Sequence, residues 1–343
     1  MDYISIFESI KYLKPEIAVS ITLVAIVVLD LIFSNKKIIS AISVLGLFSA
    51  GYFLFELIGV THSAFPESSV NKSIGFLSID PFGTFFKFFV LASSLFIVLF
   101  SISSNEIKKN IKRSGEYFAL IFGMIIGMMF MINSVNLILI YISLEIVSLS
   151  SYVLAGFTKL EKRNSEASLK YLIYGASSSG IMLFGISIIY GLTGTTNLLE
   201  INHVLTSIPV NPVTLSLCVI LIFAGIGYKI SSVPFHFWTP DVYEGAPVSI
   251  TAFLSVASKA AGFALLIRFI SSGFVVFIGE KGFWHLSQVF DWQTFIIIIS
   301  IATMTLGNLT ALWQTNLKRM LAYSSIAHAG YILLGLSVLS NQG

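Results

Sequence analysis

Residues 227–247 read GYKISSVPFHFWTPDVYEGAP, and this stretch decides the fold because it sets a lysine and three prolines between strongly apolar segments. Pro234 has no N–H to donate to the carbonyl of Ile230, and its ring clashes with that carbonyl. A helix that enters this stretch must therefore end just after Lys229. Inside a bilayer, such a break persists only where protein covers it or where it lines a wet cavity.

The composition identifies the chain as an integral membrane protein. Of its 343 residues, 56% are apolar and only 11% are charged, which excludes a soluble globular domain, a disordered chain and a secreted disulfide scaffold. The net charge of +3 is too small, and its lysines and arginines too dispersed, to indicate a nucleic-acid partner. The lipid bilayer is the partner that this composition predicts.

The chain carries no cofactor motif of its own. Its one cysteine, Cys218, can neither close an internal disulfide nor hold an iron-sulfur cluster alone. It has no glycine-rich dinucleotide or phosphate loop, no paired metal-ligand histidines and no nucleophile motif. Any nucleotide, flavin or metal cluster that matters is therefore expected on another chain.

The apolar segments predict an all-α, polytopic transmembrane bundle with a discontinuous helix. A bilayer needs about 20 apolar residues per helix. We expect ten spans, at 16–34, 38–60, 81–104, 116–133, 136–157, 166–190, 213–232, 248–271, 293–314 and 319–339. The apolar stretch 273–279 is too short to cross and is expected at the interface.

Lysine and arginine in the short loops predict the orientation, since cytoplasmic loops retain positive charge. The cations that alternate onto one side are Lys36, Lys37, Lys108, Lys109, Lys112, Arg113, Lys159, Lys162, Arg163, Lys318 and Arg319. The other side has only Lys72 and Lys281 in its loops, with Lys11 and Lys14 ahead of the first span. We therefore expect the N-terminus outside. The first helix lacks a cleavage site and is expected to be retained.

The fifth and tenth predicted spans resemble each other. Both open with Asn-Leu, at Asn136 and Asn316, and both carry Tyr-x-Leu-x-Gly, from Tyr152 and from Tyr331. Internal repeats of this kind are common in transporters. The similarity predicts a second repeat that begins near residue 293 and is incomplete in this sequence.

Three ionisable residues lie deep in the predicted spans, where a charge costs about 2.5 to 3.5 kcal/mol. Lys259 stands 11 residues into the span that begins at Val248, about 16 Å deep and beyond the reach of a snorkelling side chain. Glu145 follows Asn136 by nine residues, among serines, and Lys229 lies at the predicted break. We expect these three residues to transfer protons.

If Glu145 and Lys229 form a pair, we expect that pair to act as a proton switch. Desolvation lowers the pKa of a lysine and a nearby carboxylate raises it, so the proton affinity of such a pair depends on its separation. The alternative for Glu145 and Lys229 is a static pair that only fixes helix packing. The alternative for Lys259 is a purely structural salt bridge.

Weaker candidates for proton transfer are Lys170, His236 and His328. Snorkelling alone would explain Lys170, near the start of the sixth span. His236 could be a satisfied loop histidine, and His328 lies inside the tenth span, where a neutral histidine is tolerated or relays protons. Charged residues nearer to span ends are expected to snorkel or anchor, namely Asp30, Glu56, Lys87 and Arg268. Tryptophans are expected in the interfacial belt, namely Trp238, Trp284, Trp292 and Trp313.

The residues from Glu145 through Lys170 and Lys229, the segment VPFHFWTPDVYEGAP at 233–247 and Lys259 together resemble the subunit N family of the proton-pumping NADH-quinone oxidoreductase, respiratory complex I. The resemblance covers nearly the whole chain. It implies an antiporter-like architecture of two inverted repeats, each with a broken helix. It also implies that Glu145, Lys229 and Lys259, with Lys170, match the family's membrane-embedded proton-transfer residues.

The resemblance further implies a division into helices 1–3 at 1–115, a first antiporter-like repeat with a proton half-channel at 116–271, and the start of a second repeat at 272–343. It implies a bacterial inner-membrane location and other complex I membrane-arm subunits as partners. FMN, iron-sulfur clusters, NADH and quinone are expected only in partner subunits. The family's second broken helix lies beyond Gly343, which favours a fragment.

Three rival functions stay open. A subunit of a multisubunit sodium-proton antiporter or of a membrane-bound hydrogenase shares the antiporter-like pattern. A structural membrane spacer without transport is disfavoured by the three deep charges. An independent small-solute carrier is the weakest rival, because no cluster of substrate-shaped polar groups accompanies those charges.

Overall fold

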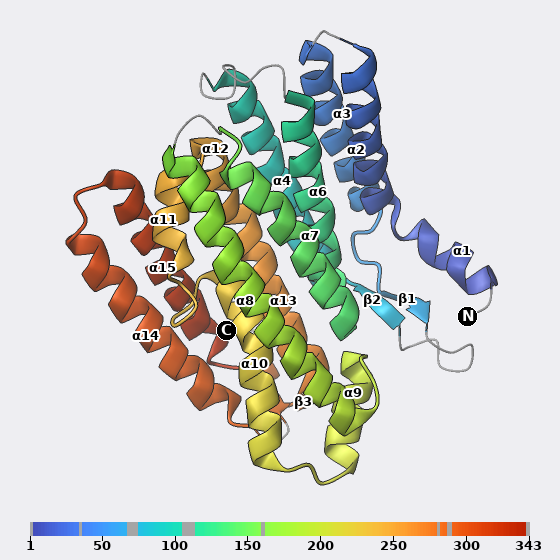
Figure 1. Ribbon diagram of the computed structural model, residues 1–343. Coiled ribbons are helices and arrows are strands. Elements are labelled where there is room, and N and C mark those ends of the chain that lie inside the picture. The colour runs from blue at the N-terminus through green and yellow to red at the C-terminus, as the bar shows by residue number, and fades with distance from the viewer. Residues whose placement is uncertain are drawn as a thin grey trace. The chain divides into compact units, whose positions relative to one another are not determined.

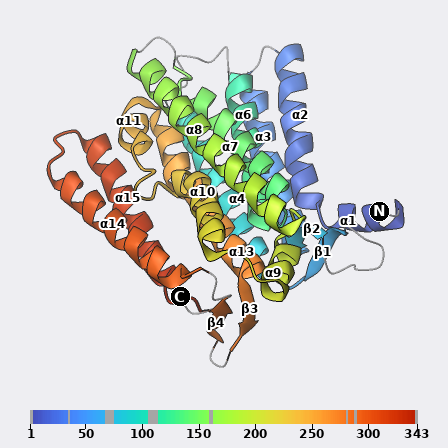
Figure 2. The ribbon, with the colours of Figure 1, turned by 60° about the horizontal axis from the view of Figure 1, so that its bottom comes forward.

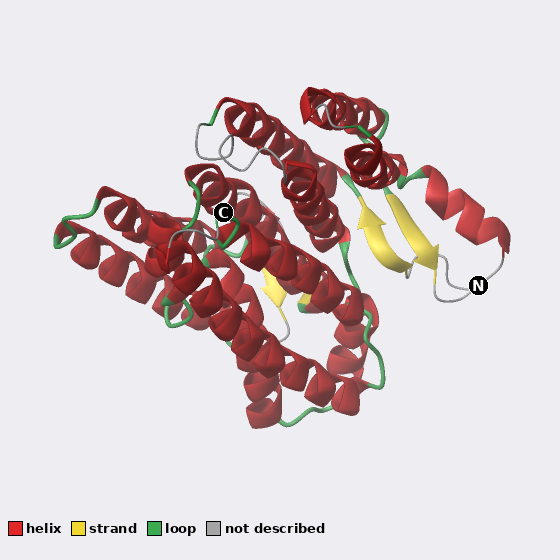
Figure 3. Ribbon diagram, turned by 45° about the horizontal axis from the view of Figure 1, so that its top comes forward, coloured by secondary structure: helices red, strands yellow, loops and turns green. Residues whose placement is uncertain are grey.

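The computed structural model describes residues 3–33, 36–66, 75–104, 114–158, 162–279, 282–286 and 290–340 (Figure 1). Helices account for most of the described chain, and the strands are confined to two short pairs (Figure 3). Several loop cations behind the predicted orientation lie outside the described residues, namely Lys72, Lys108, Lys109, Lys112, Arg113, Lys159 and Lys281.

The helices follow one another through the whole described chain. They are α1 (Tyr3–Lys11), α2 (Lys14–Ile32), α3 (Lys36–Phe55), α4 (Pro81–Ser103), α6 (Ser114–Asn133), α7 (Leu137–Ala155), α8 (Lys162–Thr193), α9 (Leu198–Ser207), α10 (Pro212–Ile230), α11 (Trp238–Gly245), α12 (Val248–Phe253), the π-helical turn η2 (Leu254–Ser258), α13 (Lys259–Gly273), α14 (Trp292–Leu312) and α15 (Leu317–Leu336). The strands are β1 (His62–Pro66), β2 (Gly75–Ile79), β3 (Val275–Ile278) and β4 (Trp284–Leu286).

Within the described residues, nine helices are long and apolar enough to cross a membrane, and they coincide with the first nine predicted spans. The eighth of these spans, Val248–Gly273, is continuous through α12, η2 and α13. The tenth predicted span is also a helix, α15, of 20 residues. It is not among the nine, and its sequence carries two cations, two serines and a histidine. The protein is a multi-pass membrane protein.

The helix break after Lys229 is present in the structure. Helix α10 ends at Ile230, and Ser231 adopts a left-handed conformation with φ of 62°. A short helix, α11, then forms within the proline-containing segment. Pro240 stands in the first turn of α11, where a missing N–H is tolerated, and Pro247 directly precedes α12.

The two antiparallel strand pairs were not predicted from the sequence. Strands β1 and β2 pair from His62 with Ile79 to Pro66 with Gly75. Strand β3, which lies in the stretch 273–279 that was expected at the interface, pairs with β4 (Figure 2). Both pairs are short, as suits connections between membrane helices, and strand propensity in such segments is weak without its packing context.

The chain divides into two compact units by internal contacts: Met1–Leu169 with Gly245–Ala264, and Lys170–Glu244 with Leu265–Gly343. Each unit contains a pair of contacting helices, α6 with α7 in the first and α14 with α15 in the second. In each pair, an asparagine begins the second helix. The Asn136 side chain accepts from the N–H groups of the second and third residues after it, and Asn316 does the same.

In each of these two helix pairs, a glycine of the first helix lies close against the second helix. A Cβ on Gly127 would lie 2.7 Å from Cγ2 of Val147, and a Cβ on Gly307 would lie 2.6 Å from the backbone nitrogen of Ala327. These glycines and their partners stand 180 residues apart, as the two asparagines do. The sequence similarity therefore reflects two features that both helix pairs have. An asparagine caps the second helix, and a glycine lets the two helices approach closely. The three-part division of the chain stays a prediction.

A buried ion pair inside the first unit corrects the expectation for Lys87. Its Nζ lies 2.5 Å from Oε1 of Glu16, and the two side chains are 1% and 3% exposed. Lys87 therefore does not snorkel: it joins α4 to the first turn of α2. Near these helices, Leu13, Ala64, Leu77 and Ile79 form an apolar cluster that includes both strands of the β1–β2 pair.

The tryptophans divide between core and surface. Trp292 is 1% exposed and packs edge-on against Phe274 and Phe290, with ring centroids 4.9 Å apart in each case. Trp238 is 2% exposed, whereas Trp313 is 88% exposed. The interfacial-belt expectation is wrong for the two buried rings, since an indole with partners in its own unit packs there instead.

The glycine contact predicts that Gly307→Ala destabilises the protein. The added methyl must push against the backbone of Ala327, which costs about 1 to 3 kcal/mol when a packed interface is overfilled. The matched control is Gly180→Ala, because a Cβ there meets nothing within 4 Å and helix propensity alone should make it neutral or stabilising. Thermal unfolding of the detergent-solubilised protein measures both. A Gly307→Ala protein as stable as the control would contradict the close approach.

The buried ion pair predicts opposite results for single and double substitutions. Lys87→Met leaves the Glu16 carboxylate buried without its cation and should cost about 3 to 5 kcal/mol. Lys87→Met combined with Glu16→Leu should recover most of that loss, because an apolar pair of similar volume needs no desolvation of charge. Lys14→Met, which opens the exposed pair with Glu56, is the control and should change stability by less than about 1 kcal/mol. Equal losses in the single and double variants would refute the explanation.

Candidate functional site

Lys229 lies buried at the end of α10, in the helix's last turn, with 2% of its surface exposed. The backbone beyond it finds partners within the second unit. Ser232 donates its N–H to the carbonyl of Gly227 at 2.9 Å, and Val233 donates to Oγ1 of Thr303 on α14 at 3.0 Å. The N–H groups at the break are therefore satisfied by protein, as a break inside a membrane requires.

Aromatic packing fixes the two sides of the break against each other. Trp238, the first residue of α11, donates its indole N–H to the carbonyl of Tyr228 at 3.0 Å. Its ring stacks on Tyr171 with centroids 4.5 Å apart, and the Tyr228 hydroxyl donates to the carbonyl of Tyr171 at 3.0 Å. The position of Lys229, beside Tyr228, is consequently set by α8 and α11 as well as by its own helix.

Lys259 occupies a second irregularity, in the first unit. It is 6% exposed and is the first residue of α13, directly after the π-helical turn η2. Single π-helical turns inside α-helices are rare and occur often at functional sites. The sequence placed Lys259 deep in its span but did not reveal this turn, because no glycine or proline marks it.

Glu145 lies near the middle of α7 in the first unit and is half-buried. Two of the serines near it in the sequence donate their hydroxyls to carbonyls of the helix backbone. Ser143 donates to the carbonyl of Ile140 at 2.9 Å, and Ser151 donates to that of Ser148 at 2.8 Å. Glu145 and Lys229 belong to different units, so their pairing stays a prediction.

The two candidate histidines differ in surroundings. His236 is 4% exposed in the segment between α10 and α11, and its ring lies 4.3 Å from that of Phe237. His328 is exposed on α15, with its ring 5.7 Å from that of Tyr331. The structure does not bring His328 to Lys229 or His236 by any described contact.

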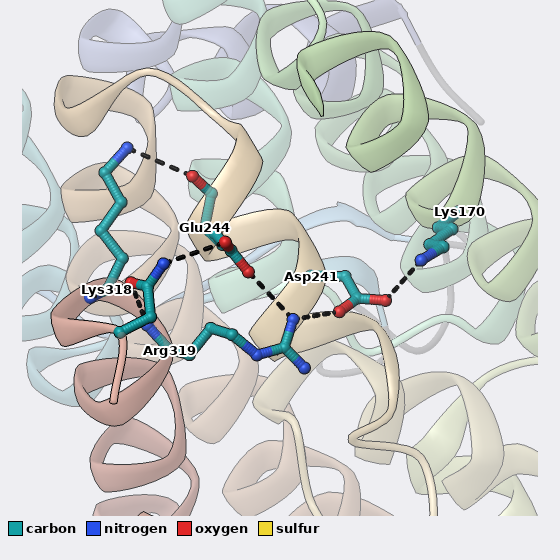
Figure 4. A network of polar contacts seen from close by, with 6 residues as sticks. Lys170, Asp241, Glu244, Lys318 and Arg319 are labelled. Carbon is teal, nitrogen blue, oxygen red and sulfur yellow. Dashed lines mark hydrogen bonds and ion pairs between the residues drawn. The ribbon is translucent and has the colours of Figure 1, made fainter. Parts of the chain in front are cut away.

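Lys170 belongs to a charged network that the sequence reading missed (Figure 4). Its Nζ lies 2.8 Å from Oδ2 of Asp241 on α11. The other oxygen of that carboxylate, Oδ1, lies 2.6 Å from Nη1 of Arg319 on α15. Snorkelling therefore does not describe Lys170, because its amine points to a carboxylate within the second unit.

Glu244, one turn after Asp241 on α11, also contacts the start of α15. Its Oε2 accepts from Nη1 of Arg319 at 3.0 Å, and its Oε1 accepts from Nδ2 of Asn316 at 2.9 Å. The Nζ of Lys318 donates to the backbone carbonyl of Glu244 at 3.3 Å. The sequence of the segment 233–247 contained a sign of this network: Asp241 and Glu244 are three residues apart and so lie on the same face of a helix.

Asp241 lies outside the nine candidate spans, and its charge state follows from its neighbours. Partial burial alone would raise the pKa of its carboxyl, but hydrogen bonds and charge from Lys170 and Arg319 outweigh burial and hold that pKa below its usual value. The carboxylate is therefore negative at neutral pH, and it loses that charge only when the pH falls through the lowered pKa.

Among the described residues, no group of three or more His, Cys, Asp or Glu side chains is placed to hold an ion. Amines, carboxylates and imidazoles such as those of Lys229, Glu145 and His236 can bind and release protons.

The family profile described as NADH:quinone oxidoreductase/Mrp antiporter, TM, matches residues 134–343. NADH-quinone oxidoreductase subunit N 2 of Chloroherpeton thalassium is 49% identical over 332 residues, which cover 96% of this chain and 63% of that protein. Subunit N of Chlorobium chlorochromatii is 42% identical, with coverages of 98% and 64%.

Among solved structures, a chain of respiratory complex I from Thermus thermophilus with bound aureothin superimposes with a TM-score of 0.74. It is 29% identical, and the match covers 94% of this chain and 64% of that one. The present chain thus spans less than two thirds of the length of the relatives that it matches. The profile match, the membrane helices and the break at Lys229 agree: the chain belongs to the NADH:quinone oxidoreductase/Mrp antiporter family of membrane proteins.

Proposed function

We propose that this chain is part of subunit N of an NADH-quinone oxidoreductase and that it moves protons across a bacterial inner membrane. The observation that carries the proposal is the placement of Lys229 and Lys259, which are 2% and 6% exposed and each lie at an irregularity of a membrane helix. A buried ionisable residue in a membrane helix is costly and is kept mainly where it transfers charge. The names of the relatives support the choice of complex.

In this proposal the chain itself performs no redox chemistry. Electron transfer from NADH to quinone takes place in partner subunits, which hold the FMN and iron-sulfur clusters, and other membrane-arm subunits flank this one. Charge moving along the membrane arm opens or closes the Glu145 and Lys229 pair, and a proton then passes towards Lys259. A change of about 3 to 4 kcal/mol in the interactions of one amine is sufficient to take up or release a proton.

The orientation follows from the same proposal. The loops that carry most lysines and arginines face the cytoplasm, which sets the N-terminus outside. A sodium-proton antiporter subunit or a membrane-bound hydrogenase subunit is the remaining alternative, because the family description names both an oxidoreductase and an antiporter. Identity of 42% to 49% to subunit N proteins favours the oxidoreductase.

The assignment to a complex predicts co-migration on a native gel. A tagged copy of the full-length subunit, solubilised from membranes in mild detergent, should migrate with a large band that stains for NADH-driven dye reduction. Migration in an assembly without NADH oxidation would overturn the oxidoreductase assignment and favour the antiporter alternative. Sodium dependence of transport would then separate antiporter from hydrogenase.

The role of Lys259 predicts that Lys259→Met abolishes transport without preventing assembly. Met keeps the length and apolar stem of the side chain but cannot carry a proton, so NADH-driven proton uptake by inverted vesicles should fall at least roughly tenfold. Uptake is normalised to the complex detected on the native gel. Lys14→Met, at an exposed ion pair in the same unit, is the control and should pump normally. Normal pumping by Lys259→Met would refute the relay.

A further inference from the structure

The carboxylate of Asp241 is shared between two cations that come from different helices of the second unit. Oδ2 lies 2.8 Å from the amine of Lys170 on α8, and Oδ1 lies 2.6 Å from the guanidinium of Arg319 on α15 (Figure 4). Both oxygens are thus engaged in short, charge-assisted contacts. Any change in the charge of Lys170 changes the interaction that remains between Asp241 and Arg319.

The N-terminal end of α15 is held against α11 by contacts that do not involve Asp241. Glu244 holds it through three other contacts: with Arg319 at 3.0 Å, with Asn316 at 2.9 Å, and through its backbone carbonyl with Lys318 at 3.3 Å. Asp241 therefore adds little as a second anchor for α15. What it adds uniquely within the described network is an electrostatic link from α15 to Lys170.

The two cations on Asp241 are not equivalent. A guanidinium stays protonated at any physiological pH, whereas an amine exchanges its proton readily when its surroundings change. The side chains of Lys170, Asp241 and Arg319 are 40%, 29% and 30% exposed, so water can reach them. The Lys87 and Glu16 pair, at 1% and 3% exposure, lacks such access.

We propose that Asp241 is a positioning residue of the proton pathway, and that it couples the proton occupancy of Lys170 on α8 to the N-terminal end of α15. With Lys170 protonated, the carboxylate is shared between both helices. With Lys170 neutral, the carboxylate pairs with Arg319 alone, and Glu244 competes for the same guanidinium. Helix α15 begins at an asparagine cap, as does α7, which contains Glu145. The coupling therefore reaches the helix pair α14 and α15, which resembles the pair α6 and α7. The inference rests on the proposed function.

The experiment compares pH profiles of NADH-driven proton uptake in inverted vesicles that contain the assembled complex with full-length subunit variants. A carboxylate beside an amine favours the charged amine, and such neighbours shift titrations by one unit or more. Asp241→Asn keeps the shape and removes the charge, so the alkaline limb of the profile should move to lower pH by about one unit. Arg319→Gln, which leaves Asp241 to Lys170, should move the limb to higher pH. Asp241→Glu should restore the wild-type limb.

The double variant Asp241→Asn with Arg319→Gln should resemble Asp241→Asn alone, because the effect of Arg319 passes through the missing carboxylate. Glu56→Gln, at an exposed ion pair of the first unit, is the matched carboxylate-to-amide control. A profile that moves as much in this control overturns the proposal. So does an Asp241→Asn variant that only lowers the amount of complex on the native gel and leaves the limb in place.

Lys259→Met separates the failure of this inference from the failure of the proposed function. If Lys259→Met stops pumping while the limb stays fixed in Asp241→Asn, the coupling alone is wrong. If Lys259→Met pumps normally, the proposed function fails and the coupling fails with it. Should Asp241→Asn not assemble, Arg319→Gln tests the link from the other side, and a limb that does not move there overturns it.

Discussion

The break after Lys229 depends on one constraint: a helix broken inside a membrane must have its backbone N–H groups satisfied by protein. In this chain, the N–H groups of Ser232 and Val233 find the carbonyl of Gly227 and the hydroxyl of Thr303. Trp238 binds the carbonyl of Tyr228 in the same region. These contacts come from α10, α11 and α14, so the break is an assembled structure of the second unit. They are what allows Lys229 to stand, buried, at a helix end.

The charged residues of the chain fall into two physical classes. Lys87 and Glu16 form a buried pair, with side chains 1% and 3% exposed, which holds α4 to α2. The network of Lys170, Asp241 and Arg319 is partly exposed, and the carboxylate at its centre is divided between two helices. A buried pair is suited to fix helix packing. A partly exposed carboxylate that contacts two cations is suited to respond to a change in the charge of either one.

The similarity between the helix pairs α6–α7 and α14–α15 has a simple structural basis. A helix pair must approach closely and its second helix must begin at a defined residue. Gly127 and Gly307 meet the first requirement, and Asn136 and Asn316 meet the second. Such local rules are readable from sequence because each depends on a single residue type: glycine for the absence of a Cβ, and asparagine for a side-chain acceptor at the helix start.

The sequence by itself determined the membrane helices and the break after Lys229, because apolar length and proline chemistry act locally. It predicts the depth of Lys259 and Glu145 for the same reason. Only the tertiary structure decided that Lys87 is paired and that Trp238 and Trp292 are buried, since snorkelling and burial are equally compatible with the same residue near a span end. The π-helical turn before Lys259 has no marker residue. The link between Lys170, Asp241 and Arg319 joins positions more than 70 residues apart, and no local rule in one sequence specifies such a contact.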